Sequence, residues 1–367
     1  MEKEKLFAIL RLQKVKTIGN ILAKKLISTV GDVENLFKEN LGTLQKINGI
    51  GTNAIANLLD ESNLILVEKE LQYIIDHNIE YSYFLDDGYP ENLKHCIDGP
   101  ILFFKDGTID FSNQRTLSIV GTRKMTHYGR DFCNQLIEEL AIYNPIIVSG
   151  FAYGVDICAH KAAIKNKLQT IAVLAHGFKQ IYPKSHKQYI NDVNRNGGFI
   201  TEFWHNDQPL REHFLQRNRI VAGLTKATII IESAEKGGSL VTADIANSYN
   251  RDVFAVPGKT TDLFSKGCNN LIKNHKAHLV NSSEDIIHIL GWDSITKPKK
   301  EIQKQLFVAL DAKEQKIYNY LKDNNAQLLD IIAIACDIPS HQLASILLQL
   351  ELKGVIRPLP GKMFELT

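Results

Sequence analysis

The fold is decided by the stretch from Thr116 to Gly150, TLSIVGTRKMTHYGRDFCNQLIEELAIYNPIIVSG. It begins and ends with short apolar runs, LSIV and PIIV, and the segment between them has a helical pattern. Runs that are apolar throughout, rather than at every second position, indicate strands that are covered on both faces. The stretch therefore predicts one β–α–β unit of a parallel sheet with helices on each side.

Further apolar runs of strand length continue this pattern to about Leu290. They are TIAVLAHG, GFITEF, ATIIIES, DVFAVPG and AHLV, and helical stretches separate them. The alternation predicts a Rossmann-like α/β domain. Ligands of such sheets bind at the carboxyl ends of the strands, so we expect the residues just after each run to share one surface.

The regions before this core have a different pattern. Residues 1–80 are helical with short loops, and Ile47-Asn48-Gly49-Ile50-Gly51 predicts a tight turn between two short helices. Such a turn is typical of helix-hairpin-helix or SAM-like domains that touch DNA phosphates, and a plain structural turn is the alternative. Residues 81–293 hold a loop-rich connection, with one strand near Ile101 to Phe104, and then the Rossmann-like domain.

The C-terminal part has the pattern of a winged-helix domain. Residues 294–306 are polar and basic and indicate a linker, and residues 307–367 show three helices and a hairpin with Gly361 in its turn. The helix that would enter a DNA groove offers only His341 and Lys353 as possible cations. Because base reading needs bidentate donors, contact with a protein, or another role that reads no bases, is at least as good an interpretation of this helix.

The composition limits the classes of function. The chain has 367 residues and a formal net charge of +2, so an anionic ligand must be attracted by a local patch rather than by a global field. The five cysteines are scattered without CxxC spacing, which favours a reducing compartment such as the cytosol. No signal-peptide pattern is present, and no apolar run approaches the roughly 20 residues of a membrane span. We therefore expect a cytosolic protein without a membrane partner.

Residues suited to anion binding follow several of the predicted strands. They are Gly121, Thr122 and Arg123 after the first strand, Ser149 and Gly150 after the second, Lys184 and Lys187 after the third, Lys236, Gly237, Gly238 and Ser239 after the fifth, and Lys259 after the sixth. Glycines at the start of a helix expose backbone N–H groups, and the basic side chains supply charge. Tyr182 and Tyr189 add rings that can stack on bases, as a single-stranded nucleic-acid groove requires. These are more phosphate positions than one mononucleotide uses.

The signatures of several enzyme classes are absent. The GxGxxG spacing of dinucleotide folds and the GK[ST] of ATP-binding loops are missing, so no cofactor is expected. Ser149 lacks the GxSxG context of a nucleophile, and Asp156 with His160 is better interpreted as a helix cap and a packing residue than as an acid–base pair. The candidate metal ligands do not form complete sets; they are Glu202, Glu232, Cys268, His275 and His278. We expect neither a catalytic residue nor a metal.

Several motifs together resemble one known family. VGTR, SGFAYGVDICAH, TIAVLAHG, FLQRNRIVAGLT, ESAEKGGSLVTADIA, VPG and SKGCNNLI are similar, in order and spacing, to the DNA-processing protein A family, called DprA or Smf, from about Tyr89 to Val280. The resemblance implies a non-enzymatic cytosolic protein that binds single-stranded DNA cooperatively and dimerises through its Rossmann domain. It also implies that the protein protects incoming DNA and helps to load the RecA recombinase during natural transformation.

The resemblance assigns DNA-binding roles to particular residues. The arginine of the family's GTR motif falls on Arg123, the lysines after its YP pair fall on Lys184 and Lys187, and its RNR motif falls on Arg217, Asn218 and Arg219. Because Arg217 and Arg219 are two positions apart on a predicted helix, they point in different directions. One is expected to reach the phosphates while the other braces a carboxylate, for which Glu202 and Glu232 are candidates. Structural ion pairs at both arginines are the alternative.

A second resemblance leads to a different function. EKGGSLVTADIA also looks like the GGxGTxxE phosphate loop of the lysine-decarboxylase-like phosphoribohydrolases, which process nucleoside monophosphates. That chemistry needs a carboxylate in the helix of the loop, and Thr242-Ala243-Asp244 does not match the required spacing. A nucleotide-processing enzyme is therefore the alternative hypothesis, and a purely structural scaffold leaves the basic loops unexplained.

Overall fold

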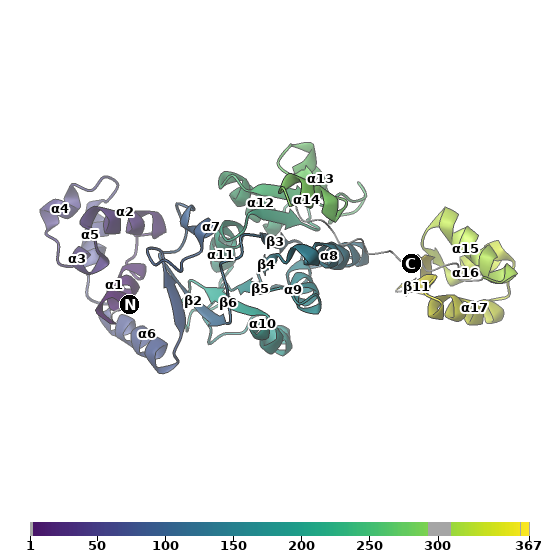
Figure 1. The fold of residues 1–367 in the computed structure, drawn as a ribbon, viewed down its shortest axis with the longest axis horizontal. Coiled ribbons are helices and arrows are strands. Elements are labelled where there is room, and N and C mark those ends of the chain that lie inside the picture. Colours follow the sequence, from purple (N-terminus) through teal and green to yellow (C-terminus); the bar gives the residue numbers. More distant parts are fainter. Residues whose placement is uncertain (1–2, 293–309, 360, 367) are drawn as a thin grey trace. The chain divides into compact units, whose positions relative to one another are not determined.

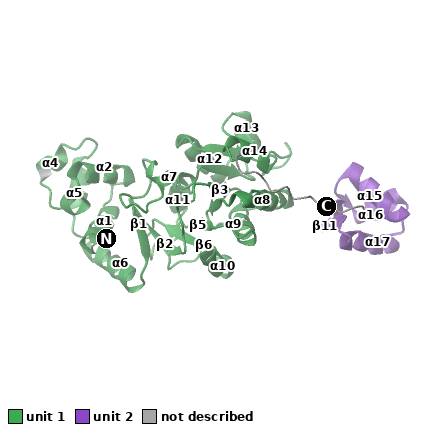
Figure 2. Cartoon of the chain, in the orientation of Figure 1, with its two compact units in different colours: residues 1–296 green, residues 297–367 purple. Residues whose placement is uncertain are grey.

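The computed structural model describes residues 3–292, 310–359 and 361–366. It divides the chain into two compact units, residues 1–296 and 297–367 (Figure 2). The predicted linker, residues 294–306, lies outside the described residues. Within the first unit, the N-terminal helices and the α/β core belong to the same compact body.

The core of the first unit is a nine-stranded sheet with the order β1-β2-β6-β5-β4-β3-β7-β8-β9 (Figure 1). Its strands are β1 (Glu80–Tyr83), β2 (Leu102–Gly107), β3 (Thr116–Val120), β4 (Ile146–Ser149), β5 (Thr170–Val173), β6 (Gly197–Thr201), β7 (Ala227–Ile230), β8 (Asp252–Ala255) and β9 (His278–Leu279). Neighbours from β6 through β9 in this order are parallel, whereas β1 and β2 form an antiparallel edge that joins β6. The predicted Rossmann-like core is confirmed.

Helices cover both faces of the sheet, as the apolar runs predict. One apolar cluster contains residues of α8 (His127–Leu140), α9 (Val155–Lys165) and α14 (Ser283–Ile289), and another contains residues of α11 (Arg211–Gly223), α12 (Gly238–Ser248) and α13 (Lys266–Lys273). Ile229 of β7 belongs to the first cluster and the adjacent Ile230 to the second. Successive side chains of a strand point to opposite faces, so this alternation explains why β7 has no polar side that faces water.

The order of the strands creates a switch point beside β3. From β3 the chain moves outward through β4 and β5 to β6, and α11 then leads it back to β7 on the other side of β3. The short elements α7 (Glu91–Lys94), η1 (Ala141–Tyr143), η2 (Lys184–Tyr189) and α10 (Ile190–Arg195) complete this part of the chain. Loops after β3 and β7 diverge at such a point, and ligands of open parallel sheets bind in the resulting crevice.

Six helices precede the sheet and pack against its antiparallel edge. They are α1 (Lys3–Gln13), α2 (Asn20–Val30), α3 (Val33–Leu36), α4 (Leu41–Gln45), α5 (Thr52–Leu59) and α6 (Leu64–Asp76). One apolar cluster joins them to Leu102 and Phe104 of β2 and to Trp204 beyond β6. The predicted turn lies between α4 and α5, where Gly49 adopts a φ of 92° that favours glycine.

The second unit is the predicted winged-helix domain. It consists of α15 (Ala312–Asn324), β10 (Gln327–Leu328), α16 (Leu329–Cys336), α17 (Ser340–Leu352), β11 (Ile356–Leu359) and β12 (Met363–Leu366), with the strand order β10-β12-β11. The ammonium group of Lys353 lies 2.6 Å from both carboxylate oxygens of the buried Glu314. One of the two cations expected on the recognition helix is therefore engaged within the domain.

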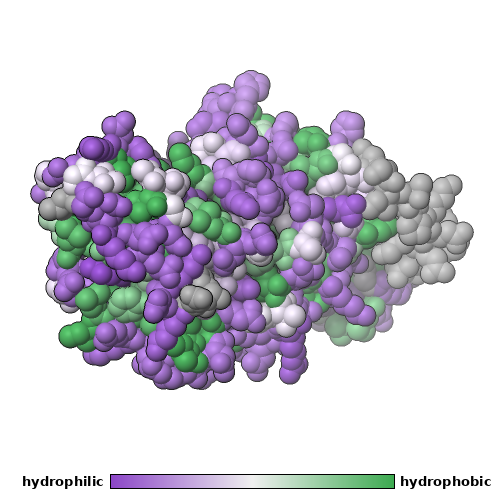
Figure 3. Space-filling model, turned by 60° about the vertical axis from the view of Figure 1, so that its left-hand side comes forward, coloured by the Kyte–Doolittle hydropathy of each residue, from purple (hydrophilic) through white to green (hydrophobic). Residues whose placement is uncertain are grey.

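The surface is mixed in character. Hydrophilic residues predominate on the face that Figure 3 shows, and hydrophobic residues lie among them in separate groups. Such scattered apolar exposure is usual for a folded protein. Among the helices that the structure describes, none is by itself long and apolar enough to cross a membrane; α16 and α17 meet that criterion only together, with a bend of 106° between them.

His160 belongs to the core rather than to a reactive pair. Its side chain is fully buried on α9, and Nδ1 lies 2.7 Å from the hydroxyl of Thr170 on β5. Thr170 donates its own hydroxyl proton to the carbonyl of Ile147, so Nδ1 is the protonated nitrogen that donates to Thr170. Burial, together with the nearby Arg217 charge, lowers the pKa of His160 from 6.5 to about 3.

This burial predicts a specific loss of stability in acid. Unfolded His160 binds a proton below about pH 6.5, whereas the folded residue stays neutral until about pH 3. The stabilising contribution is thus complete above pH 6.5 and is lost as the pH falls toward 3, by about 1.4 kcal/mol per pH unit. Urea unfolding between pH 4 and 7 measures the difference in unfolding free energy between the wild type and His160→Asn. This difference should shrink by about 1.4 kcal/mol for each pH unit as the pH falls. Parallel curves would contradict the assignment.

Candidate functional site

A cavity of about 770 Å³ lies at the switch point, at the carboxyl ends of β3, β4 and β7. Its wall is completed by the first half of α11 and by Tyr182 from the loop after β5. The predicted site residues that line it are Gly121, Thr122, Arg123, Arg217, Asn218, Lys236, Gly237, Gly238 and Ser239. The strand-end prediction therefore brings together residues that are more than 100 positions apart in the chain.

The lining of the cavity is strongly basic. Its charged side chains, among the described residues, are four cations and one carboxylate: Arg123, Arg211, Arg217, Lys236 and Asp156. Arg123, Arg211 and Lys236 are exposed to solvent, whereas Arg217 and Asp156 are buried. A concave surface with this excess of positive charge attracts anions although the whole chain is nearly neutral.

Arg217 is the fixed cation of the cavity. Its guanidinium packs on the backbone of Gly150, where an added Cβ would lie only 1.8 Å from Nη1. Burial lowers the pKa of Arg217 and raises that of Asp156, and the attraction between the two charges offsets part of both effects. Within the described parts of the chain, Nε of Arg217 has no hydrogen-bond partner. A buried donor in this position is suited to an anionic ligand.

Backbone N–H groups converge on the same cavity. Gly237 caps α12 without a side-chain acceptor, so the first N–H groups of the helix are left for a ligand. The hydroxyl of Ser239 donates to Ser233 at 2.9 Å and thereby braces this loop. Before α9, Gly154 has a φ of 76°, and a Cβ there would lie 2.2 Å from the carbonyl of Thr122. This glycine lets the loops after β3 and β4 approach each other.

Aromatic rings form the outer wall. The Tyr182 and Phe214 rings meet edge to face with centroids 5.6 Å apart, and the guanidinium of Arg123 lies 5.3 Å from the Phe214 centroid. Sequence reasoning identified Tyr182 but missed Arg211, Phe214 and Leu215. The signal was present, because Arg211, Phe214, Leu215 and Asn218 have i, i+3, i+4, i+7 spacing and so share one face of α11.

Other predicted site residues do not line the cavity. Ser149 is buried and donates its hydroxyl to the carbonyl of Ile119 at 2.6 Å, and Gly150 lies beneath Arg217. Lys184 and Lys187 are exposed on η2, next to Tyr182 in sequence, and Lys259 is exposed in the loop after β8.

The two arginines of RNR are separated as expected from their spacing. Arg217 faces the cavity, whereas Arg219 points away and bonds through its guanidinium to the carboxylate of Glu202 and to the carbonyl of Asp98. Glu232, the other candidate partner, accepts the N–H of Thr126 at 2.8 Å and also its hydroxyl proton. Arg219 therefore joins α11 to the segments that contain Glu202 and Asp98 and does not belong to the cavity.

The candidate metal and enzymatic residues do not assemble into a site. In the parts of the chain that the structure describes, no group of three His, Cys, Asp or Glu side chains is placed to hold a metal ion. Asp244, the carboxylate nearest to the phosphoribohydrolase pattern, is exposed and pairs with Lys276 at 2.9 Å. It does not line the cavity.

Comparisons with known proteins agree with this architecture. Residues 80–291 match the protein-family model described as DNA recombination-mediator protein A, and residues 304–362 match the DprA winged helix domain. The DNA processing protein DprA of Streptococcus pneumoniae is 34% identical over 281 residues, which cover 75% of this chain and 96% of that protein. Protein Smf of Escherichia coli is 32% identical over 306 residues, which cover 82% and 79%.

Solved structures of DNA processing protein A are also similar to the chain. The X-ray structure of DNA processing protein A from Streptococcus pneumoniae matches with a TM-score of 0.67 and 31% identity, covering 78% of this chain and 98% of that one. The structure of DNA processing protein A from Helicobacter pylori, described for its single-stranded DNA binding mode, matches with a TM-score of 0.53 and 29% identity, covering 58% and 97%.

The separate roles of the two arginines predict different effects on stability. Arg219→Leu should lower the free energy of unfolding by about 3–5 kcal/mol, because it leaves the Glu202 carboxylate buried without its cation. Adding Glu202→Gln should recover part of this loss, since it removes the unpaired charge. Arg211→Leu, at the exposed start of the same helix, should change stability by no more than about 0.5 kcal/mol. Urea unfolding measures all three; equal effects of Arg211→Leu and Arg219→Leu would contradict the assignment.

Proposed function

We propose, since this chain belongs to the DprA/Smf family of DNA-processing recombination mediators, that its cavity binds the backbone of single-stranded DNA. The observation that carries the proposal is the convergence of four cations, free helix N–H groups and two rings on one cavity. A single phosphate needs far fewer donors. A flexible strand can place successive phosphates on the cations and bases on the rings, which is the usual design of single-strand grooves.

Each part of the cavity has a distinct role in this proposal. Phosphate is held at the base of the cavity by Arg217 and by the N–H groups at Gly238 and Ser239. The shape of this base is given by Gly121, Thr122, Gly237 and Asn218, and Ser149 and Gly150 support it from beneath. Arg123 and Lys236 bind phosphate nearer the rim. Lys184, Lys187 and Lys259 extend the positive surface beyond the rim, and Arg219 acts only through the position of α11.

The relatives support a wider role in recombination. We propose that the protein protects incoming single strands in the cytosol and helps to load RecA on them during natural transformation, as a homodimer formed through the Rossmann-like domain. Binding and handing over a strand make and break no covalent bond. The role therefore needs no catalytic residue, metal or cofactor in the cavity.

The first test is the salt dependence of binding. Wild-type protein should prefer single-stranded to duplex oligonucleotides, with log K falling against log salt by about 0.7 per neutralised phosphate. Arg123→Ala should weaken binding by about tenfold for every sequence and make the slope shallower by about 0.7, because phosphate contacts carry no base code. Arg195→Ala, an exposed arginine on α10 outside the cavity, is the matched control. Salt-insensitive binding, or equal effects of the two variants, would refute the proposal.

The second test concerns RecA. On a single-stranded oligonucleotide, a gel-shift titration of RecA should reach half-saturation at a lower RecA concentration when the wild-type protein is present. Arg123→Ala should lose this effect at concentrations where it no longer binds DNA, and Arg195→Ala should keep it. If wild-type protein binds the strand but leaves the RecA titration unchanged or inhibits it, RecA loading is wrong while strand binding stands.

A further inference from the structure

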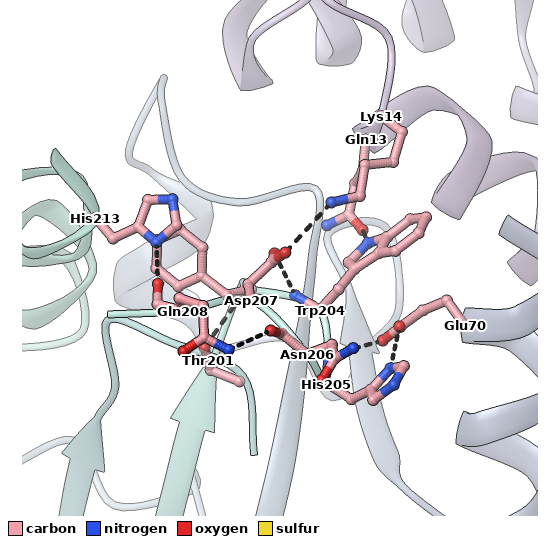
Figure 4. Close-up of polar contacts among 11 residues, drawn as sticks. Gln13, Lys14, Glu70, Thr201, Trp204, His205, Asn206, Asp207, Gln208 and His213 are labelled. Carbon is pink, nitrogen blue, oxygen red and sulfur yellow. Dashed lines mark hydrogen bonds and ion pairs between the residues drawn. The ribbon is translucent and has the colours of Figure 1, made fainter. Parts of the chain in front are cut away.

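The loop that connects β6 to α11, residues 202–210, lies between the cavity and the N-terminal helices. Pro209 near the end of the loop lines the cavity, and so does Arg211, the first residue of α11. Trp204, His205 and Asp207, earlier in the same loop, face α1 and α6 (Figure 4). One short segment therefore contacts the N-terminal helices at one end and the cavity at the other.

A buried carboxylate on α6 holds the middle of this loop. Glu70 is only 3% exposed and accepts the backbone N–H of His205 at 3.0 Å, while its other oxygen bonds to Nδ1 of the same residue. The His205 ring also stacks on Tyr73, with centroids 3.9 Å apart and planes inclined by 13°. Within the described residues, the hydrogen bonds that Glu70 accepts come from His205. The Glu70 carboxylate is thus directed at the loop and not at the neighbouring N-terminal helices.

Contacts from α1 fix the residues on either side of His205. The indole N–H of Trp204 donates to Gln13 at 3.1 Å. The ammonium group of Lys14 lies 4.2 Å from the Trp204 ring centroid and 3.6 Å from the Asp207 carboxylate, which in turn accepts the backbone N–H of Trp204 at 3.0 Å. Hydrogen bonds, an ion pair and ring contacts therefore act together on a stretch of four residues.

The loop is bonded on its other side to the loop after β5. The N–H groups of Gly177 and Lys179 donate to the carbonyls of Asp207 and His205, both at 3.0 Å. The loop after β5 then continues to Tyr182, which meets Phe214 in the outer wall of the cavity. The loop after β5, which carries Tyr182, and the loop that leads to Phe214 are therefore both bonded through His205 and Asp207. These are the residues that Glu70 and Lys14 contact.

We infer that the N-terminal helices position the outer wall of the cavity through a clamp made of Lys14, Glu70, Trp204, His205 and Asp207. Glu70 is the positioning residue: it touches no ligand, and it acts through His205 on Arg211, Phe214 and Tyr182. A free loop of this length samples many backbone conformations, and ordering it on binding weakens affinity. The clamp fixes the loop in advance. Its consequence for DNA binding rests on the function proposed above.

Glu70→Gln tests the clamp in the ligand-free protein. It removes the carboxylate charge and one acceptor oxygen, so hydrogen exchange should become at least several-fold faster over residues 204–207 and also over residues 211–214. Glu68→Gln is the matched control, because Glu68 lies two positions earlier on α6 and is exposed. Faster exchange confined to residues 204–207, or equal effects of the two variants, would overturn the inference. If Glu70→Gln does not fold, His205→Gln removes the imidazole contacts with Glu70 and Tyr73 from the loop side and leaves the backbone N–H contact in place.

Strand binding supplies the second readout. Glu70→Gln should lower the affinity for single-stranded DNA by about threefold to tenfold and reduce the magnitude of the salt slope, by up to about 0.7 if one phosphate contact is lost. In an Arg211→Ala background the same substitution should have a smaller effect, because the two residues act on one wall. The inference is wrong if the losses of affinity caused by Glu70→Gln and Arg211→Ala are fully additive. It is also wrong if Glu70→Gln lowers the melting temperature and leaves the affinity unchanged, because Glu70 then contributes only to stability. If the wild type binds no DNA, the proposed function fails and the exchange data still decide the clamp.

Discussion

The packing of the Arg217 guanidinium on the backbone of Gly150 determines how the rest of the cavity is built. A charged group taken out of water is costly unless partners compensate it. Asp156, at the start of α9, offsets part of this cost by attraction, and Nε is left without a protein partner among the described residues. A Cβ at position 150 would displace the guanidinium, so the glycine in the loop after β4 keeps Arg217 in this position. The cavity thus holds a desolvated, oriented cation before any ligand arrives.

The same helix links this cation to the segment around Asp98, which is itself bonded to α2. Residues two apart on a helix point about 200° away from each other, so Arg217 and Arg219 serve opposite sides of α11. Arg219 bonds to Glu202 and to the carbonyl of Asp98, while Lys24 of α2 donates to the carbonyl of Cys96 in the same segment. A buried ion pair adds little net stability but strongly penalises other arrangements of its partners. The orientation of α11, and with it the direction of Arg217, is therefore fixed from the side away from the ligand.

Much of the fold was predictable because buried parallel strands leave a simple signal. The apolar runs located β3 to β9, and the residues after them located most of the cavity. The antiparallel edge was not predictable in full, since β1 comes from a segment with mixed polarity that becomes a strand only by pairing with β2. The position of a residue after a strand does not predict the path of a long loop. It predicted that Lys184, Lys187 and Lys259 lie with the cavity residues, whereas η2 and the loop after β8 place these lysines outside the cavity. Phe214 was not predicted because an aromatic residue has no charge to mark it, and only the helical face that it shares with Arg211 and Asn218 places it in the cavity.

Charge is concentrated rather than spread over this protein. The whole chain has a net charge of +2, yet the cavity gathers four cations around one described carboxylate. The helix α17 is the opposite case, because Lys353 is engaged by Glu314 and the exposed residues Ala344, Ser345 and Leu348 are neutral. Attraction of a polyanion depends on local potential, which a concave surface with low-dielectric walls strengthens. The cavity of the first unit, and not the exposed face of α17, therefore concentrates positive charge.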